Sequence, residues 1–130
     1  MGLRVVEPAG LVPWEDLDSE VQEDVLISIK TRTGIPKDYT RKRFDSEPPL
    51  LQLVNVDPLE IEDPNQNLSE GLIEDYAQAM KRRRKFPPVI IDSRLGPVVA
   101  LIEGRHRTAA AIMARKPRIL AIDIAPLLQA

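Results

Sequence analysis

Hydrophobic positions recur at helical spacing in three parts of the chain. After Pro13, apolar side chains lie four residues apart at Leu17, Val21, Val25 and Ile29. This stripe predicts a helix, which Gly34 and Pro36 would end near Arg32. The same reasoning predicts a helix from about Leu68 to Arg83 and another from about Arg105 to Arg115.

Runs of branched apolar residues predict four strands, at Leu50–Val56, Val89–Ile91, Pro97–Ile102 and Ile119–Ile124. The second and third runs flank the turn Ser93–Gly96, so we expect them to form a hairpin. The resulting order is strand, helix, strand, strand, helix, strand. This order predicts an α/β (α+β) protein, in which a small mixed sheet is packed against helices.

The first third of the chain is predicted to be an addition to this unit. Residues 1–49 would form an N-terminal helix and linker, and residues 50–130 the main domain. The segment Lys37–Pro49 is mostly charged, which predicts a surface loop. The apolar stripe of the first helix needs a cover, which we expect from the same domain, with a homo-oligomer as the alternative. Asn67 followed by Glu70 resembles a capping box for the second helix.

Composition narrows the class of protein. The 130 residues carry 18 Lys and Arg against 20 Asp and Glu, a net charge of −2, so any nucleic-acid surface must be local. Without cysteine, the chain has no disulfide, thiolate metal site or cysteine nucleophile. No apolar stretch is long enough to span a bilayer, and the first residues lack a secretory core. We therefore expect a cytoplasmic protein that does not bind membranes.

The segment Ile102–Ala111 carries the clearest chemical signal. A glycine, Gly104, stands between a predicted strand and a predicted helix, and two arginines flank the only histidine, His106. Glycine permits a tight turn, and the free N–H groups of the following helix form a pocket for phosphate. Arginine can grip phosphate oxygens in pairs. The sequence therefore predicts a phosphate or nucleotide site.

The individual residues of this segment have alternative interpretations. His106 would bond a phosphate oxygen or move a proton, or it would simply bond backbone at the helix start. Successive helix positions point about 100° apart, so only one of Arg105 and Arg107 can reach a single phosphate well, and we favour Arg107. Thr108 would offer its hydroxyl to phosphate or metal, or would cap and pack.

The order of elements, with Pro88–Asp92, Glu103–Ala111 and Ile119–Ile124, resembles the ParB N-terminal and sulfiredoxin superfamily over about residues 51–124. In that superfamily the turn after the hairpin carries a Gly-x-[His/Arg]-Arg-x-x-Ala pattern that binds nucleotide phosphates. The matching residues here are Gly104, His106, Arg107 and Ala110. Pro64–Gln66 is similar to a Pro-x-Gln segment that lines the nucleotide pocket, which implies a contact from Gln66. The resemblance implies ATP or CTP as ligand, with Mg²⁺ arriving on the nucleotide.

Members of the superfamily differ in activity, so the resemblance implies several functions. Sulfiredoxins carry a cysteine after the glycine, where this chain has Arg105, so that activity is excluded. ParB partition proteins usually carry glutamate there and append a DNA-binding domain, so a partition clamp is not expected. Small kinases of the superfamily carry a glutamate near the end of the first strand, in the region of Glu60 and Glu62. The main expectation is a nucleotide-binding domain that is a phosphotransferase or NTP hydrolase.

Phosphoryl transfer also needs carboxylates, to hold Mg²⁺ or to accept a proton. The candidate catalytic residues are Glu60 and Glu62, with the neighbouring Asp63, together with His106. Asp92 and Glu103, at the ends of predicted strands, are the candidate metal ligands. Each of these would otherwise be a solvated charge.

Five consecutive cations predict a second kind of contact. The run comprises Lys81, Arg82, Arg83, Arg84 and Lys85. Cations complement the dipole at a helix C-terminus, but five exceed that need, so the run is a candidate nucleic-acid surface. The alternative function is therefore a DNA- or RNA-binding module, or a ParB-like nuclease, without nucleotide turnover.

Overall fold

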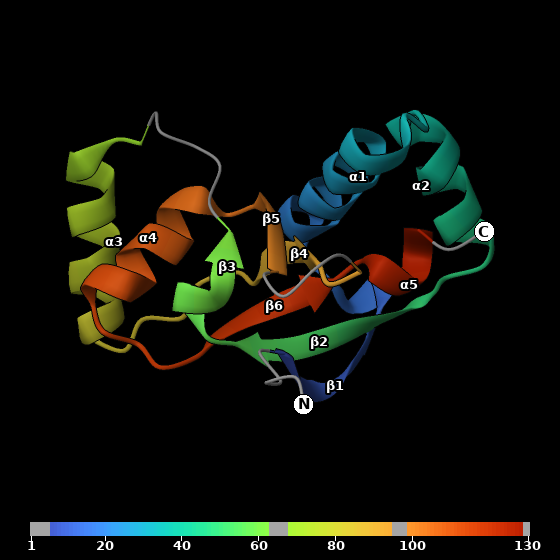
Figure 1. Cartoon of the computed structure of the whole chain (residues 1–130). Helices are drawn as coiled ribbons and strands as arrows, with labels where there is room; N and C mark the ends of the chain where they lie inside the picture. Colours follow the sequence, from blue (N-terminus) through green and yellow to red (C-terminus); the bar gives the residue numbers. More distant parts are fainter. Residues whose placement is uncertain (1–5, 63–67, 95–98, 129–130) are drawn as a thin grey trace.

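A six-stranded mixed sheet forms the centre of the structure, a computed structural model that describes residues 6–62, 68–94 and 99–128 (Figure 1). Its strands follow the order β1-β2-β6-β4-β5-β3. The bounds are β1 Val6–Pro13, β2 Leu50–Val56, β3 Ile61–Glu62, β4 Val89–Asp92, β5 Val99–Glu103 and β6 Ile119–Asp123. The predicted mixed α/β class is confirmed, and the predicted strands correspond to β2, β4, β5 and β6.

Helices lie at both ends of the sheet. Figure 1 shows α3 and α4 together at one end, and α1, α2 and α5 at the other. The bounds are α1 Ser19–Thr33, α2 Lys37–Ser46, α3 Glu70–Lys81, α4 Arg105–Met113 and α5 Ala125–Leu128. Among the described residues, no helix is long and apolar enough to cross a membrane.

The β4–β5 hairpin places the candidate site at the end of two inner strands of the sheet. The two strands are antiparallel, with Ile91 opposite Leu101, as predicted. β4 also pairs in parallel with β6, which follows α4 in the chain. The turn from β5 into α4 therefore begins at the end of a central hairpin, and both flanking elements hold it in place.

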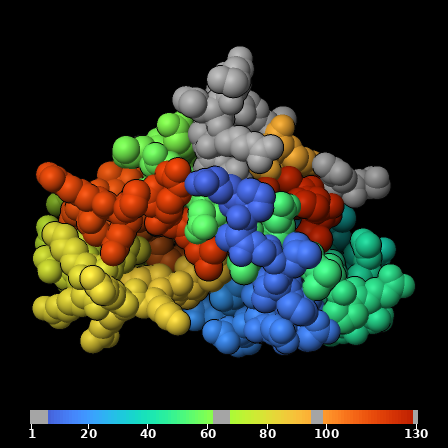
Figure 2. Space-filling view, turned by 90° about the horizontal axis from the view of Figure 1, so that it is seen from below, coloured from blue at the N-terminus to red at the C-terminus, as the bar shows by residue number. Residues whose placement is uncertain are grey.

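The N-terminal segment is part of this fold rather than an addition to it. β1 pairs with β2 along the whole length of both strands, and Figure 2 shows β1 across the middle of one face. Buried side chains of α1, including Val25, Leu26 and Ile29, share one core with Ile90 and Ile122 of the sheet. The prediction that residues 1–49 are a separate extension thus disagrees with the described part of the segment, because its apolar stripe covers the sheet.

The segment predicted as a surface loop contains a helix, α2. Thr40 and Phe44, four residues apart, are its buried residues, and the Phe44 ring packs edge-on against Trp14 at a centroid distance of 5.0 Å. Glu23 of α1 forms ion pairs with Lys37 and Arg41. One aromatic contact and these ion pairs thus fix a helix that has no continuous apolar stripe.

The cap of α3 also differs from the prediction. Ser69 is the N-cap residue, and its hydroxyl accepts a hydrogen bond from the N–H of Leu72 at 3.3 Å. Asn67, predicted for this role, lies outside the described residues. Serine is a good N-cap residue because its short side chain reaches the free N–H groups of the first turn.

Candidate phosphate-binding site

Gly104 makes the turn from β5 into α4 and tolerates no side chain. Its φ of 106° lies in the left-handed region, where residues other than glycine are strained. A Cβ at this position would lie 2.5 Å from Cγ1 of Val89. The glycine therefore permits both the tight turn and the close approach of α4 to β4.

The first turn of α4 has backbone donors that the helix itself does not satisfy. Its first hydrogen bond runs from the N–H of Thr108 to the carbonyl of Gly104, so the N–H groups of Arg105, His106 and Arg107 have no helical acceptor. Gly104 provides no side-chain cap. Such a helix start attracts anions, because the helix dipole adds to the free N–H groups.

A pocket of about 710 Å³ opens at this end of α4, and we call it the α4 pocket. Its lining combines three kinds of side chain around the turn at Gly104. The basic ones are Lys85, Arg105, His106 and Arg107, the aromatic ones Tyr76 and Phe86, and the acidic ones Glu20, Asp24 and Glu103. The volume is in the range typical of small-molecule sites.

Of the cations in the turn, Arg105 is the one that has no partner among residues 6–62, 68–94 and 99–128. It is exposed, and within the described part of the chain it makes no ion pair or side-chain hydrogen bond. Lys85, also exposed, enters the same pocket from the segment after α3.

Arg107 has a structural role instead, contrary to the prediction that favoured it as the phosphate grip. Its guanidinium donates to the carbonyls of Pro87, at 2.9 Å, and Pro88, at 3.2 Å, and lies 3.6 Å from the Asp24 carboxylate. Its side chain is 14% exposed. Arg107 thus ties α4 to the segment before β4 and to α1, because its guanidinium has found acceptors inside the protein.

His106 lies at the pocket and also bonds backbone. Its Nε2 accepts a hydrogen bond from the N–H of Ser69 at 3.1 Å. This is the backbone-bonded alternative that the sequence left open. The contact fixes the start of α3 against the start of α4.

Thr108 is not available to a ligand. The residue is buried, and its hydroxyl donates to the Gly104 carbonyl at 3.0 Å. The predicted contact with phosphate or metal is therefore wrong, and the packing alternative holds.

Asp92, predicted to bind metal, is neutralised inside the protein. Its carboxylate is fully buried and accepts hydrogen bonds from Arg94 of the following turn and from Arg32 of α1, at distances of 2.9–3.2 Å. Burial raises the pKa of Asp92, but the hydrogen bonds from Arg94 and Arg32 outweigh it and hold the pKa below its usual value. Two guanidinium groups satisfy the carboxylate, so it is not a metal ligand.

Asp92 and Glu103 also lie at opposite ends of the hairpin. Asp92 pairs with Ala100, three residues before Glu103 on β5, which is about 10 Å of strand. Among the described residues, no group of three or more His, Asp and Glu side chains could hold a metal ion. Of the two predicted ligands, only Glu103 lines the α4 pocket.

Of the two predicted catalytic glutamates, only Glu60 has a side chain among the described residues. Glu60, in the turn Pro58–Glu60, is absent from the lining of the α4 pocket. Glu62 is in β3, but its side chain lies outside the described residues, as do Asp63 and Gln66. Their predicted roles are therefore untested.

The acidic residues of α1 are pocket residues that the sequence reasoning missed. Glu20 and Asp24 are one helical turn apart and form part of the wall of the pocket. Burial raises the pKa of Asp24, although Arg107 opposes the shift. In the sequence, Glu20 and Asp24 lie beside the apolar stripe, each one position before Val21 and Val25, and this spacing does not indicate which part of the sheet they face.

The run of five cations divides among three environments. All five residues are exposed. Lys85 lines the α4 pocket, and Arg83 and Arg84 line a second pocket. Lys81 and Arg82 line neither. Three of the five cations therefore line pockets, and the prediction that the run binds nucleic acid stays a prediction.

No family model, curated protein or solved structure matches this chain. The family that the motifs resemble therefore stays a hypothesis.

Proposed function

We propose that this protein binds a nucleotide, whose phosphates lie against the start of α4. The observation that carries the proposal is the start of α4, where Arg105, His106 and Arg107, whose N–H groups have no helical acceptor, line a pocket of about 710 Å³. Backbone donors at a helix start suit phosphate oxygens, and a guanidinium adds a charged contact. Gly104 keeps this end of the helix accessible.

The charge balance of the pocket favours a nucleotide that carries Mg²⁺. Lys85, Arg105 and Arg107 are matched by three carboxylates, those of Glu20, Asp24 and Glu103. A bare triphosphate would meet repulsion from these carboxylates, whereas bound Mg²⁺ would offset it. Bound Mg²⁺ would neutralise charge on the phosphates. The carboxylates, most simply that of Glu103 beside the turn, and the phosphates of the nucleotide would together hold the metal ion.

An aromatic corner supports a nucleotide over inorganic phosphate. Tyr76 and Phe86 both line the pocket, and their rings meet edge-on with centroids 5.2 Å apart. Apolar ring surface beside a phosphate site suits a base, as in ATP or CTP. Turnover, as a phosphotransferase or hydrolase, would use the described acids of this pocket, because Glu60 does not line it.

The test is a titration of fluorescently labelled ATP and CTP, with and without Mg²⁺. We expect saturable binding that requires Mg²⁺ and that weakens about tenfold in Arg105→Ala, the loss of one charge-assisted contact. Arg115→Ala is the matched control, because Arg115 is exposed just beyond the other end of α4 and lines neither pocket. Absence of saturable binding by the unmodified protein, or equal weakening in both variants, would contradict the proposal.

A further inference from the structure

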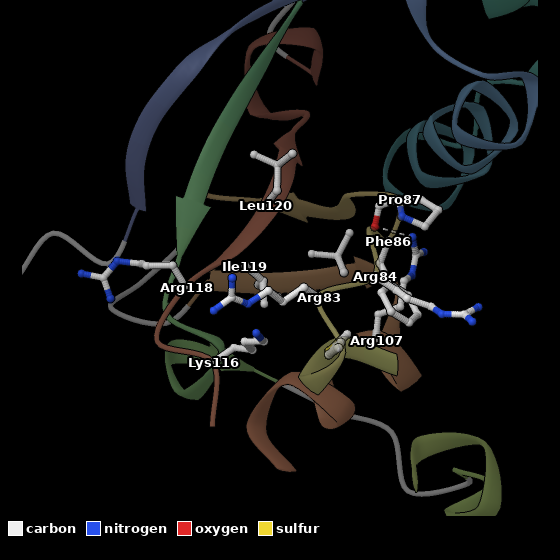
Figure 3. Close-up of a pocket in the computed structure, with 11 residues that line it drawn as sticks. Arg83, Arg84, Phe86, Pro87, Arg107, Lys116, Arg118, Ile119 and Leu120 are labelled. Atoms are coloured by element: carbon white, nitrogen blue, oxygen red, sulfur yellow. Dashed lines mark hydrogen bonds between the residues drawn. The ribbon is translucent and has the colours of Figure 1, made fainter. Parts of the chain in front are cut away.

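A second pocket shares Phe86, Pro87 and Arg107 with the α4 pocket. It has a volume of about 340 Å³ and lies where the ends of α3 and α4 meet the start of β6. Figure 3 shows Arg83, Lys116 and Arg118 around its opening, with Phe86, Pro87 and Arg107 across from them. We call this pocket the arginine cleft.

The lining of the arginine cleft is basic and apolar. Among the described residues, its lining contains five cationic side chains and no carboxylate, the cations being Arg83, Arg84, Arg107, Lys116 and Arg118. The other lining residues are apolar and include Met80, Phe86, Ile119 and Leu120. A ligand that matches this surface must carry negative groups and also expose apolar surface.

Most of this charge is not neutralised by the protein. Arg118 pairs with Glu7 of β1 at 2.7 Å, and Arg107 lies 3.6 Å from Asp24. Within residues 6–62, 68–94 and 99–128, the other three cations of the cleft, Arg83, Arg84 and Lys116, make no ion pair. They therefore leave a local positive field on a protein whose net charge is −2.

The backbone at Arg83 has an unusual conformation. Arg83 follows the end of α3 with a φ of 62°, a conformation in which helix ends usually place glycine. A side chain in this conformation is strained, and Arg115 after the end of α4 is strained in the same way, with a φ of 56°. Arg83 lines the cleft, so the strained position carries one of its cations.

The row of cations is longer than one nucleotide needs. Beyond the shared wall of Phe86 and Pro87, Lys85 and Arg105 continue the row in the α4 pocket. Four of the five cations of the cleft are arginines, which bind phosphate in pairs and also stack on bases. A repeating anion with planar apolar groups fits both the row and the apolar lining.

We propose that the arginine cleft binds a single-stranded nucleic acid. Its phosphates contact Arg83, Arg84 and Lys116, and one base lies against the apolar floor formed by Ile119 and Leu120. The strand must be single, because a base in a duplex is stacked and cannot enter a pocket of about 340 Å³. The cations proposed to contact the strand, Arg83, Arg84 and Lys116, do not line the α4 pocket, so either proposal can fail without the other.

The test measures fluorescence anisotropy of labelled single-stranded DNA and RNA of mixed sequence over a range of salt concentrations. Arg83→Ala/Arg84→Ala should weaken binding at least tenfold and reduce the slope of log affinity against log salt by roughly 1 to 1.5. The matched control is Lys81→Ala/Arg82→Ala, which removes the same charge from the same run outside the cleft. We expect it to change affinity less than twofold.

The Arg83→Gly variant distinguishes a loss of binding from a loss of folding. Glycine relieves the left-handed strain, so this variant should unfold at a temperature higher by roughly 2–5 °C and still bind the strand more weakly. The Arg83→Ala/Arg84→Ala variant should keep its affinity for Mg²⁺-ATP. The Arg105→Ala variant should lose more affinity for Mg²⁺-ATP than for the oligonucleotide. If the proposed nucleotide site is wrong, Mg²⁺-ATP binding fails and oligonucleotide binding persists.

Several results would overturn the proposal. One is that the two double variants weaken binding equally, which indicates a diffuse charged surface. Another is that duplex DNA or polyglutamate competes as well as the single strand, which indicates a different partner. The third is that the unmodified protein binds neither oligonucleotide.

Discussion

The two ends of the β4–β5 hairpin carry similar charged residues and use them differently. At one end, the Asp92 carboxylate is fully buried between Arg32 and Arg94. At the other end, Arg105 and the first N–H groups of α4 face a pocket. Charged residues therefore mark a binding site only where the fold gives them no internal partner.

The largest expected effect is on the turn at the open end. Gly104→Ala combines a left-handed φ with a Cβ that would overlap Val89, so we expect a loss of about 3 kcal/mol or more in unfolding free energy. Urea unfolding measures it. Gly34→Ala is the control, because Gly34 has a φ of 79° but open space around it, and we expect a loss of about 1 kcal/mol. Equal losses in the two variants would show that the contact with Val89 is unimportant.

At the closed end, Asp92→Asn should cost about 2–3 kcal/mol, because two arginines lose their carboxylate. The pKa of Asp92 is lowered in the folded protein, so its stabilisation is present above the usual value and is lost as the pH falls below about 4. Urea unfolding at several pH values should show a shallower acid loss in Asp92→Asn. Asp75→Asn, an exposed change on α3, should leave the profile unaltered. An acid loss in Asp92→Asn as steep as that of the unmodified protein would refute the account.

Two neighbouring arginines give an intermediate effect. Arg107→Ala should cost about 2 kcal/mol, because it leaves two carbonyls and the Asp24 carboxylate without their charged donor. Arg105→Ala should change the unfolding free energy by less than about 0.5 kcal/mol, since Arg105 is exposed. Thermal unfolding of both variants checks this contrast. Similar losses would mean that both arginines are structural.

The smallest effect expected from the loss of an internal contact is at His106. His106→Ala should cost about 1 kcal/mol, because the Ser69 N–H loses its acceptor. His106→Gln, whose amide oxygen can accept the same bond, should recover part of the loss. Urea unfolding of the two variants measures the difference. No difference between alanine and glutamine would indicate that the hydrogen bond contributes nothing.

The sequence predicted those parts of the fold that have a clear hydrophobic period. Helices α1, α3 and α4 and strands β2, β4, β5 and β6 are of this kind. β1 was missed because it contains Pro8, Gly10 and Pro13, which disfavour strands. The strand lies at the sheet edge, where prolines are tolerated, and its register shifts between Pro8 and Gly10.

The candidate site could be predicted only in part. A glycine before a basic helix start is visible in the sequence, and Gly104 and Arg105 occupy the expected places. The internal partners are not visible, because Arg32 and Asp92 are 60 residues apart and Arg107 bonds carbonyls 19 and 20 residues away. For the same reason the acidic wall from α1 was not foreseen.

The most direct test of the central claim follows the backbone amides of ¹⁵N-labelled protein during titration with Mg²⁺-ATP. The account predicts that the amide resonances of Arg105, His106 and Arg107 shift saturably and more than those at the C-terminal end of α4. Binding that leaves these three resonances in place, or no binding at all, would contradict the claim that the start of α4 holds phosphate.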